Sequence, residues 1–190
     1  MKILVLDNYD SFTYNLVHLV RELGFGKDLQ VHRNDKIELS EVQGFDKILL
    51  SPGPGVPSEA GIMPQLLKKY SETKSILGIC LGHQAIGEAF GGTLENMKDV
   101  YHGVATEIQL SNRNENLFKG LPDRFKVCRY HSWTVVPETF PDSLEVTSVD
   151  ENNKIMSLRH KKYDVRGLQF HPESILTEYG KNMMEQWLMG

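Results

Sequence analysis

The sequence is poor in cysteine and lacks a long hydrophobic run. Its two cysteines, Cys80 and Cys128, lie far apart. They predict no disulfide framework and favour a reducing compartment, so we expect a cytoplasmic location. The apolar start at residues 1–6 is interrupted by Asp7 and Asn8, which makes it too short for a signal-peptide core or a membrane span.

An excess of positive charge and the usual metal-binding spacings are also absent. The net charge of -4 and the isoelectric point near 6.0 argue against a nucleic-acid partner. The seven histidines show neither His-Glu-x-x-His nor paired Cys-x-x-Cys spacing, so we expect no metal and no cofactor. No repeat, low-complexity stretch or polar linker divides the chain, and its length predicts one domain over residues 1–190.

The hydrophobic pattern alternates between strand and helix in the first half of the chain. Continuous apolar strands separated by helical patterns predict a mostly parallel, twisted, open sheet with helices on both faces. Ligands then bind at the carboxyl ends of the strands. The second half is richer in strands and predicts a smaller antiparallel region before a closing helix. The expected strands are 2–7, 29–33, 46–51, 75–80, 104–110, 125–130, 144–149, 154–159 and 165–170, and the closing helix is expected near 176–188.

Cys80 lies between an apolar run and a helical pattern, in Gly78-Ile79-Cys80-Leu81-Gly82. Such a strand-to-helix turn projects a nucleophile at its apex, and the helix N-terminus favours the reactive thiolate. A lone cysteine is more often a buried small hydrophobe. However, with 16 glycines and 2 cysteines in 190 residues, chance predicts only about 0.01 occurrences of Gly-x-Cys-x-Gly. We therefore interpret Cys80 as an activated nucleophile.

A candidate base occurs near the other end, in His171-Pro172-Glu173. Pro172 keeps the preceding residue extended, so His171 and Glu173 are expected to project to the same side. A carboxylate beside an imidazole orients the ring and stabilises its protonated form. An isolated His-x-Glu would more often be a surface pair. Together with the cysteine turn, the pair predicts a nucleophile, base and orienting acid.

The segment 51–57, Ser-Pro-Gly-Pro-Gly-Val-Pro, follows another apolar strand. Prolines fix the backbone and glycines allow a ligand to approach it, so the loop can present amide groups to an oxyanion. By itself such a loop is more often only a turn. His131 and Ser132 do not lie in a Gly-x-Ser-x-Gly turn, so we read them as a binding segment. For His83, three residues after the cysteine, a packing or capping role is favoured over catalysis.

Taken together, these motifs resemble those of the class I, or triad-type, glutamine amidotransferases, a family with a flavodoxin-like sheet. The resemblance spans almost the whole chain. Within the family, the segments 7–13, 33–35 and 101–103 are similar to those of the glutaminase subunit, component II, of anthranilate synthase or aminodeoxychorismate synthase.

The resemblance implies roles for individual residues. Cys80 attacks the side-chain amide of L-glutamine, His171 transfers the protons, and Glu173 orients His171. The backbone amides of Gly55 and Leu81 hold the oxyanion. Trp133 stands where the family often has an aliphatic residue. The implied substrate-binding set comprises Gly53, Pro54, Gly55, Leu81, Gln84, Ser132 and Trp133.

The resemblance also implies a partner that consumes ammonia. The chain has no Walker A sequence and no Gly-x-Gly-x-x-Gly fingerprint, so we expect the acceptor on another polypeptide. We favour the chorismate-using component I of anthranilate synthase, in tryptophan synthesis. The alternative is component I of aminodeoxychorismate synthase, in folate synthesis, or both partners. Two other classes stay open: a Cys-dependent hydrolase or peptidase on the same scaffold, and a non-enzymatic module in which Cys80 is structural.

Overall fold

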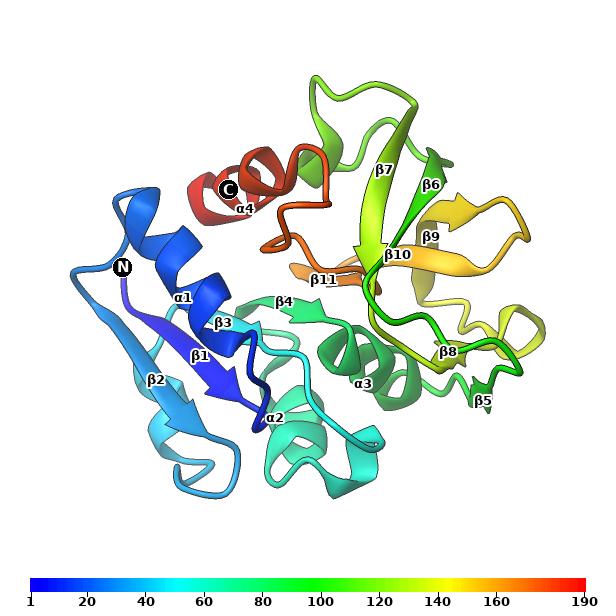
Figure 1. Cartoon of the computed structure of the whole chain (residues 1–190). Helices are drawn as coiled ribbons and strands as arrows, with labels where there is room; N and C mark the ends of the chain where they lie inside the picture. Colours follow the sequence, from blue (N-terminus) through cyan, green and yellow to red (C-terminus); the bar gives the residue numbers. More distant parts are fainter.

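A nine-stranded mixed sheet runs through the computed structural model, which describes all 190 residues (Figure 1). The strand order is β2-β1-β3-β4-β11-β10-β9-β6-β7. The first five strands pair in parallel and the remaining four pair antiparallel. The strands are β1 (Ile3–Asp7), β2 (Leu29–Arg33), β3 (Lys47–Leu50), β4 (Ser75–Ile79), β6 (Val104–Leu110), β7 (Arg124–Arg129), β9 (Leu144–Asp150), β10 (Ile155–His160) and β11 (Val165–Leu168).

Four α-helices cover the two faces of this sheet (Figure 1). They are α1 (Thr13–Glu22), α2 (Met63–Tyr70), α3 (Leu81–Ala89) and α4 (Gly180–Met189). The longest have ten residues, and no helix reaches the length and hydropathy that a bilayer span requires. Short 3-10 turns are η1 (Glu41–Gly44), η2 (Pro57–Glu59), η3 (Asn116–Phe118) and η4 (Pro137–Thr139).

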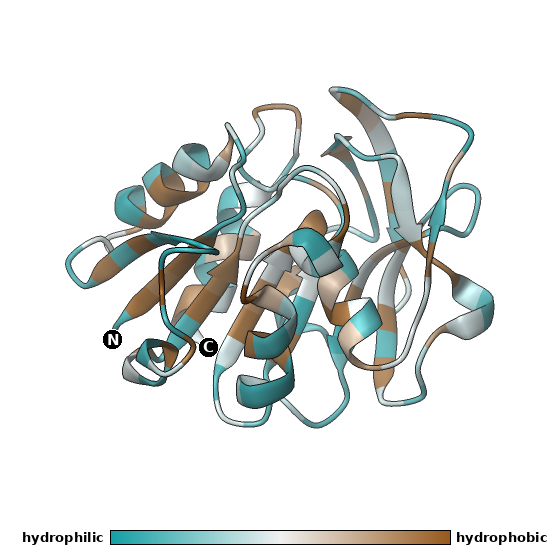
Figure 2. Cartoon of the chain, turned by 90° about the horizontal axis from the view of Figure 1, so that it is seen from below, coloured by the Kyte–Doolittle hydropathy of each residue, from teal (hydrophilic) through white to brown (hydrophobic).

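The alternation of side chains along β1 explains why both faces need helices. Ile3 and Val5 belong to the hydrophobic core beneath α1 and α4, whereas Leu4 and Leu6 belong to the core beneath α2 and α3. All four side chains are fully buried, and each contributes about 2 kcal/mol through burial. The central strands are accordingly coloured as hydrophobic along most of their length (Figure 2). The predicted α/β fold with helices on both faces is confirmed.

Some boundaries differ from the expectations. The closing helix begins at Gly180 rather than near 176, because Tyr179 adopts a left-handed conformation with φ 60° and residues 171–177 form successive turns. Strand β11 ends at Leu168 rather than at 170. A separate two-stranded antiparallel sheet, β5 (Leu94–Asn96) with β8 (Trp133–Val135), was not predicted, since three-residue strands carry too little periodicity.

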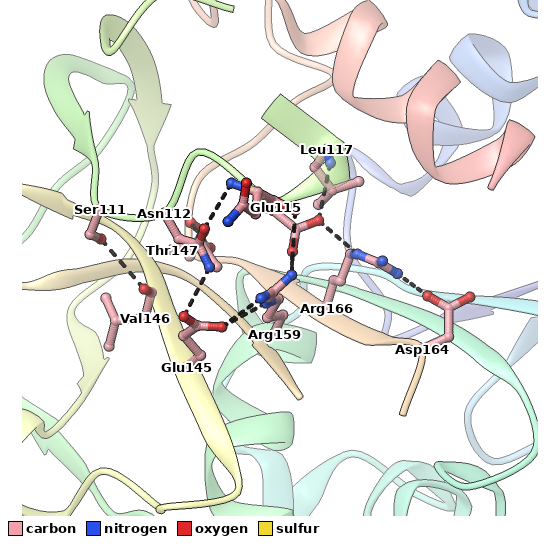
Figure 3. A network of polar contacts seen from close by, with 12 residues as sticks. Ser111, Asn112, Glu115, Leu117, Glu145, Val146, Thr147, Arg159, Asp164 and Arg166 are labelled. Atoms are coloured by element: carbon pink, nitrogen blue, oxygen red, sulfur yellow. Dashed lines mark hydrogen bonds and ion pairs between the residues drawn. The ribbon is translucent and has the colours of Figure 1, made fainter. Parts of the chain in front are cut away.

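A polar network at β9, β10 and β11 ties the loop before η3 to the sheet (Figure 3). The Glu115 side chain is 1% exposed and accepts a hydrogen bond from Nε of Arg166 over 2.8 Å and one from the Leu117 backbone N–H over 3.0 Å. Arg159 lies 3.8 Å from the same carboxylate and pairs with Glu145 at 2.8 Å. The arginines thus stabilise a carboxylate that burial alone would disfavour.

Candidate active site

Cys80 occupies the sharp turn between β4 and α3. Its backbone adopts φ 51° and ψ -97°, a conformation that residues other than glycine rarely adopt. Its N–H donates to the Leu168 carbonyl over 2.8 Å, and its own carbonyl accepts from Gln84 N–H over 3.0 Å. Strand and helix together therefore hold a strained residue at the carboxyl edge of the parallel strands, where the sequence predicted a ligand site.

The Cys80 thiol is buried and has two polar neighbours. Nε2 of Gln169 lies 3.6 Å from Sγ and donates toward it, while Sγ lies 3.9 Å from the Tyr130 carbonyl oxygen. The side chain is only 5% exposed. Because one neighbour donates and the other accepts, the site accommodates both the thiolate and the thiol.

His171 and Glu173 form a buried pair near this thiol. Nδ1 of His171 lies 2.7 Å from Oε1 of Glu173, and their side chains are 2% and 1% exposed. They meet across a turn, in which Ser174 N–H donates to the His171 carbonyl. The prediction that Pro172 keeps this segment extended is therefore wrong. The turn forms because a local backbone hydrogen bond replaces strand pairing beyond β11.

The second nitrogen of the His171 ring is left free. Nε2 is buried and forms no hydrogen bond. Burial by itself lowers the pKa of His171, but the neighbouring Cys80 thiol and the Glu173 carboxylate outweigh it and raise the pKa to about 10. The arrangement therefore favours the protonated imidazole beside the sulfur.

The loop after β3 is anchored to the segment after β1. Asn8 N–H donates to Oγ of Ser51 over 2.8 Å, and the Asn8 side chain donates to the Ser51 carbonyl over 2.8 Å. Gly55 adopts φ 72°, and a Cβ there would lie 2.4 Å from Oε2 of Glu59. The loop is thereby held in one conformation that requires glycine at Gly55.

A cavity of about 230 Å³ brings most of the predicted site residues together. This volume suits a ligand smaller than a typical drug molecule. Leu81, His171 and Glu173 do not line it, although Leu81 starts α3 directly after Cys80. The lining residues are Gly53, Pro54, Gly55, Cys80, Gln84, Tyr130, His131, Ser132 and Trp133.

His83 takes no part in this cavity. It is fully buried, burial lowers its pKa to about 4, and neither ring nitrogen has a hydrogen-bond partner. Its ring packs against Gly167 of β11, as the packing interpretation predicts. A larger cavity of about 340 Å³ lies elsewhere, beside Arg159, Tyr163 and Arg166, and contains no thiol. Nowhere do three or more His, Cys, Asp or Glu side chains gather as metal ligands would.

Sequence reasoning missed several residues that shape the site. Asn8 fixes the Gly-Pro loop, Gln169 contacts the sulfur, and Tyr130 lines the cavity. Gln169 lies two residues before His171, so its proximity to that histidine was the one available signal. Asn8 belongs to the segment 7–13 that carries the family resemblance, but its contact with the loop after β3 joins distant segments, as does the place of Tyr130 in the cavity, and no local pattern reveals such contacts.

Comparison with known proteins agrees with this geometry. The family model described as class I glutamine amidotransferase matches residues 4–190. The chain is 46% identical to anthranilate synthase component 2 of Pyropia yezoensis, covering 98% of each chain. It is 42% identical to aminodeoxychorismate/anthranilate synthase component 2 of Bacillus subtilis, covering 98% of this chain and 95% of that one.

A solved structure gives the same result for the fold. A Thermoplasma acidophilum protein described as part of a GMP synthase superimposes with a TM-score of 0.88 at 29% identity, covering 100% of this chain and 92% of the other. The chain thus combines the sharp turn at Cys80, the buried His171–Glu173 pair and the anchored loop 51–57, and the family model matches it over nearly its whole length. The chain belongs to the class I glutamine amidotransferase family.

Proposed function

We propose that this chain hydrolyses the side-chain amide of L-glutamine to glutamate and ammonia, and that residues 1–190 act as one glutamine amidotransferase domain. One observation carries the proposal. The His171 ring binds Glu173 through Nδ1 and keeps a buried, unpartnered Nε2 beside a thiol on the wall of a cavity. A nucleophile, a base and an orienting acid in this arrangement are what acyl transfer requires.

The reaction proceeds in two halves. His171 takes the proton from Sγ of Cys80, and the thiolate attacks the amide carbon of glutamine. The carbonyl oxygen becomes an oxyanion held by the backbone amides of Gly55 and Leu81, each worth about 3 kcal/mol in the transition state. Protonated Nε2 of His171 then gives its proton to the departing nitrogen, so ammonia leaves and a glutamyl thioester remains.

The second half regenerates the thiol. Water attacks the thioester carbon while His171 accepts its proton, and the same oxyanion contacts stabilise the second tetrahedral intermediate. The carbon–sulfur bond breaks, Cys80 recovers its proton from His171, and glutamate is released. Glu173 stabilises the imidazolium that forms in each half, and this role agrees with the raised pKa of His171, which burial opposes and Cys80 and Glu173 produce.

The rest of the cavity binds the amino-acid end of glutamine. We assign this role to Gln84 and to the backbone of Ser132 and Trp133, and Gly53 and Pro54 line the same cavity. The Trp133 carbonyl already accepts hydrogen bonds from Gln84 and His131, so it acts on the substrate by positioning Gln84. No cofactor or metal is needed for these steps.

The ammonia passes to a chorismate-using synthase subunit in a heteromeric complex, for which we propose component I of anthranilate synthase. This proposal is supported by relatives that are component 2 proteins of such synthases. One of them carries the names of both the anthranilate and the aminodeoxychorismate enzymes, which supports service to both partners as the second candidate. Both cysteines are free, which supports a cytoplasmic location.

Reconstitution tests the function and the partner together. The chain is mixed with each component I, and product is measured with glutamine or with ammonium salt. We expect Cys80→Ala to abolish synthesis from glutamine and to preserve synthesis from ammonium, whereas Cys128→Ala preserves both. Full glutamine-dependent synthesis by Cys80→Ala would disprove the nucleophile, and synthesis with only the aminodeoxychorismate partner would disprove the anthranilate assignment.

A further inference from the structure

A buried ion pair joins the ends of β7 and β9, two residues before His131 on the cavity wall. Nη1 of Arg129 donates to Oδ2 of Asp150 over 2.7 Å, and each side chain is 1% exposed. Oδ1 of Asp150 accepts from the backbone N–H groups of Asn152 and Lys154. Because an unpaired buried charge is strongly unfavourable, the carboxylate holds the guanidinium in one place.

Arg129 also fixes the proton of the His131 ring. Its Nε donates to Nε2 of His131 over 3.0 Å. A guanidinium has no acceptor, so this Nε2 carries no proton and the single proton of the neutral ring sits on Nδ1. Nδ1 in turn donates to the Trp133 carbonyl over 2.7 Å. Burial and then the charge of Arg129 lower the pKa of His131 to about 3, which keeps the ring neutral.

The Trp133 carbonyl oxygen links His131 to Gln84 on the cavity wall. It also accepts from Nε2 of Gln84 over 2.9 Å, and the second hydrogen of that nitrogen reaches Oε1 of Gln169 over 3.3 Å. The Gln84 carbonyl oxygen is therefore the group left for a ligand. Nε2 of Gln169 then faces Sγ of Cys80. Each hydrogen bond between Arg129 and the Cys80 sulfur therefore has one fixed donor and one fixed acceptor.

Tyr101 covers this line of contacts. Cζ of Arg129 lies 3.6 Å from the centroid of the Tyr101 ring, which also stacks on His131 at 5.6 Å. The Tyr101 N–H donates to the His131 carbonyl over 3.1 Å. A ring in this position keeps water away from the Arg129–His131 hydrogen bond, and the low local dielectric strengthens it.

We propose that Arg129, held by Asp150, is a positioning residue of the glutamine pocket: it locks His131 in the Nδ1–H tautomer, so that Trp133 and Gln84 present a fixed surface to the substrate. The inference rests on the proposed function, because it concerns affinity for glutamine. With the proton on Nε2 instead, the Nδ1 lone pair would face the Trp133 carbonyl oxygen at 2.7 Å, and the two would repel.

The tautomer is measurable in the unaltered chain by nitrogen NMR of the histidine rings. We expect the His131 ring to carry its proton on Nδ1 alone at neutral pH. A ring protonated on Nε2, or on both nitrogens, would overturn the inference. This measurement needs no variant and therefore does not depend on whether a substituted chain folds.

The functional test replaces both members of the pair. Arg129→Met with Asp150→Asn removes the two charges together and keeps a side-chain oxygen for the 150–154 turn. We expect the KM for glutamine to rise about tenfold, as for the loss of one well-placed hydrogen bond, with kcat changing less. Arg159→Gln removes an ion pair from the same sheet and serves as the control with unchanged KM.

Two further readouts separate positioning from general damage. In a His131→Phe background, the Arg129 and Asp150 changes should add no further increase in KM, because Arg129 acts through that ring. The rate at which iodoacetamide alkylates Cys80 should change by less than about twofold, because the substitutions leave the proposed triad untouched. An unchanged KM in the folded double variant, or a full additional increase in the His131→Phe background, would overturn the inference.

A diazoketone analogue of glutamine distinguishes this inference from the proposed function. If the analogue does not label Cys80 in the parent chain, the proposed function fails. If it labels the parent and the Arg129 double variant at the same rate, only the positioning role fails. We expect labelling of the parent and slower labelling of the variant.

Discussion

A Cβ atom on Gly78 would lie 2.4 Å from the carbonyl carbon of Gly82. The strand before Cys80 and the helix after it therefore approach more closely than any side chain at Gly78 permits. This approach makes the turn sharp enough to leave the cysteine at φ 51° and ψ -97°. The strain is stored at the residue that we propose as the nucleophile, as is common for nucleophile turns.

Gly78→Ala should damage this turn. The new methyl group meets backbone rather than a flexible side chain, so β4 and α3 must move apart. We expect a loss of about 2 kcal/mol in the free energy of unfolding, measured by chemical denaturation, and slower labelling of Cys80 by the diazoketone. Gly44→Ala is the matched control, since nothing lies within 4 Å of its Cβ, and it should change stability by less than about 0.5 kcal/mol. Equal stability of the two variants would contradict the close approach.

Cys80→Gly should be more stable than Cys80→Ala. Both remove the sulfur, but only glycine relieves the unfavourable backbone conformation. The relief outweighs the extra entropy that glycine gains in the unfolded chain, and we expect a difference of about 1 kcal/mol. Thermal or urea unfolding of the two inactive variants provides the comparison. A more stable alanine variant would show that the turn is not strained.

Cys80, His171 and Glu173 could be singled out from the sequence because each lies in a short local motif. Cys80 follows an apolar strand between two glycines, and Glu173 lies two residues from His171. The parallel half of the sheet was predictable for the same reason, since its strands are continuous apolar runs.

The residues that surround these three side chains were not predictable in this way. Arg129 and Asp150 lie on different strands, and each looks like an ordinary charged residue at the end of a strand. Only the folded sheet brings them together and buries them. Likewise, Tyr179 gives no local sign that it adopts a left-handed conformation, so the start of α4 was misplaced by several residues.

Glu173→Gln should change the pH dependence of the site. The pKa of His171 lies above its ordinary value of 6.5, because the effects of Cys80 and Glu173 exceed that of burial. The protonated ring therefore stabilises the fold fully below about pH 6.5, and this contribution is lost as the pH rises toward 10. Removing the carboxylate charge should lower the pKa of His171. We expect labelling of Cys80 by the diazoketone to decline as His171 loses its proton, so in the variant this decline should occur at a lower pH.

Stability measurements give the second half of this test. The difference in unfolding free energy between the parent chain and Glu173→Gln should be largest below about pH 6.5 and should shrink as the pH rises toward 10. A difference that grows with pH would mean that Glu173 does not stabilise the imidazolium.

Glu115→Gln should destabilise the fold without affecting catalysis. The substitution removes the charge that Arg159 and Arg166 neutralise (Figure 3). Both arginines remain partly in water, so we expect a loss of about 2 kcal/mol rather than the larger cost of a fully buried pair. Asp123→Asn, which breaks the exposed pair with Arg113, should cost less than about 1 kcal/mol. A change in the KM for glutamine in Glu115→Gln would contradict the separation of this network from the site.

The central claim is that Cys80 forms the covalent bond to the glutamyl group. Mass spectrometry of the intact chain after treatment with the diazoketone analogue, followed by peptide mapping, tests it most directly. We predict a single adduct on Cys80, prevented by excess glutamine and absent in His171→Ala under the same conditions. No adduct, an adduct on Cys128, or labelling that glutamine does not slow would contradict the account.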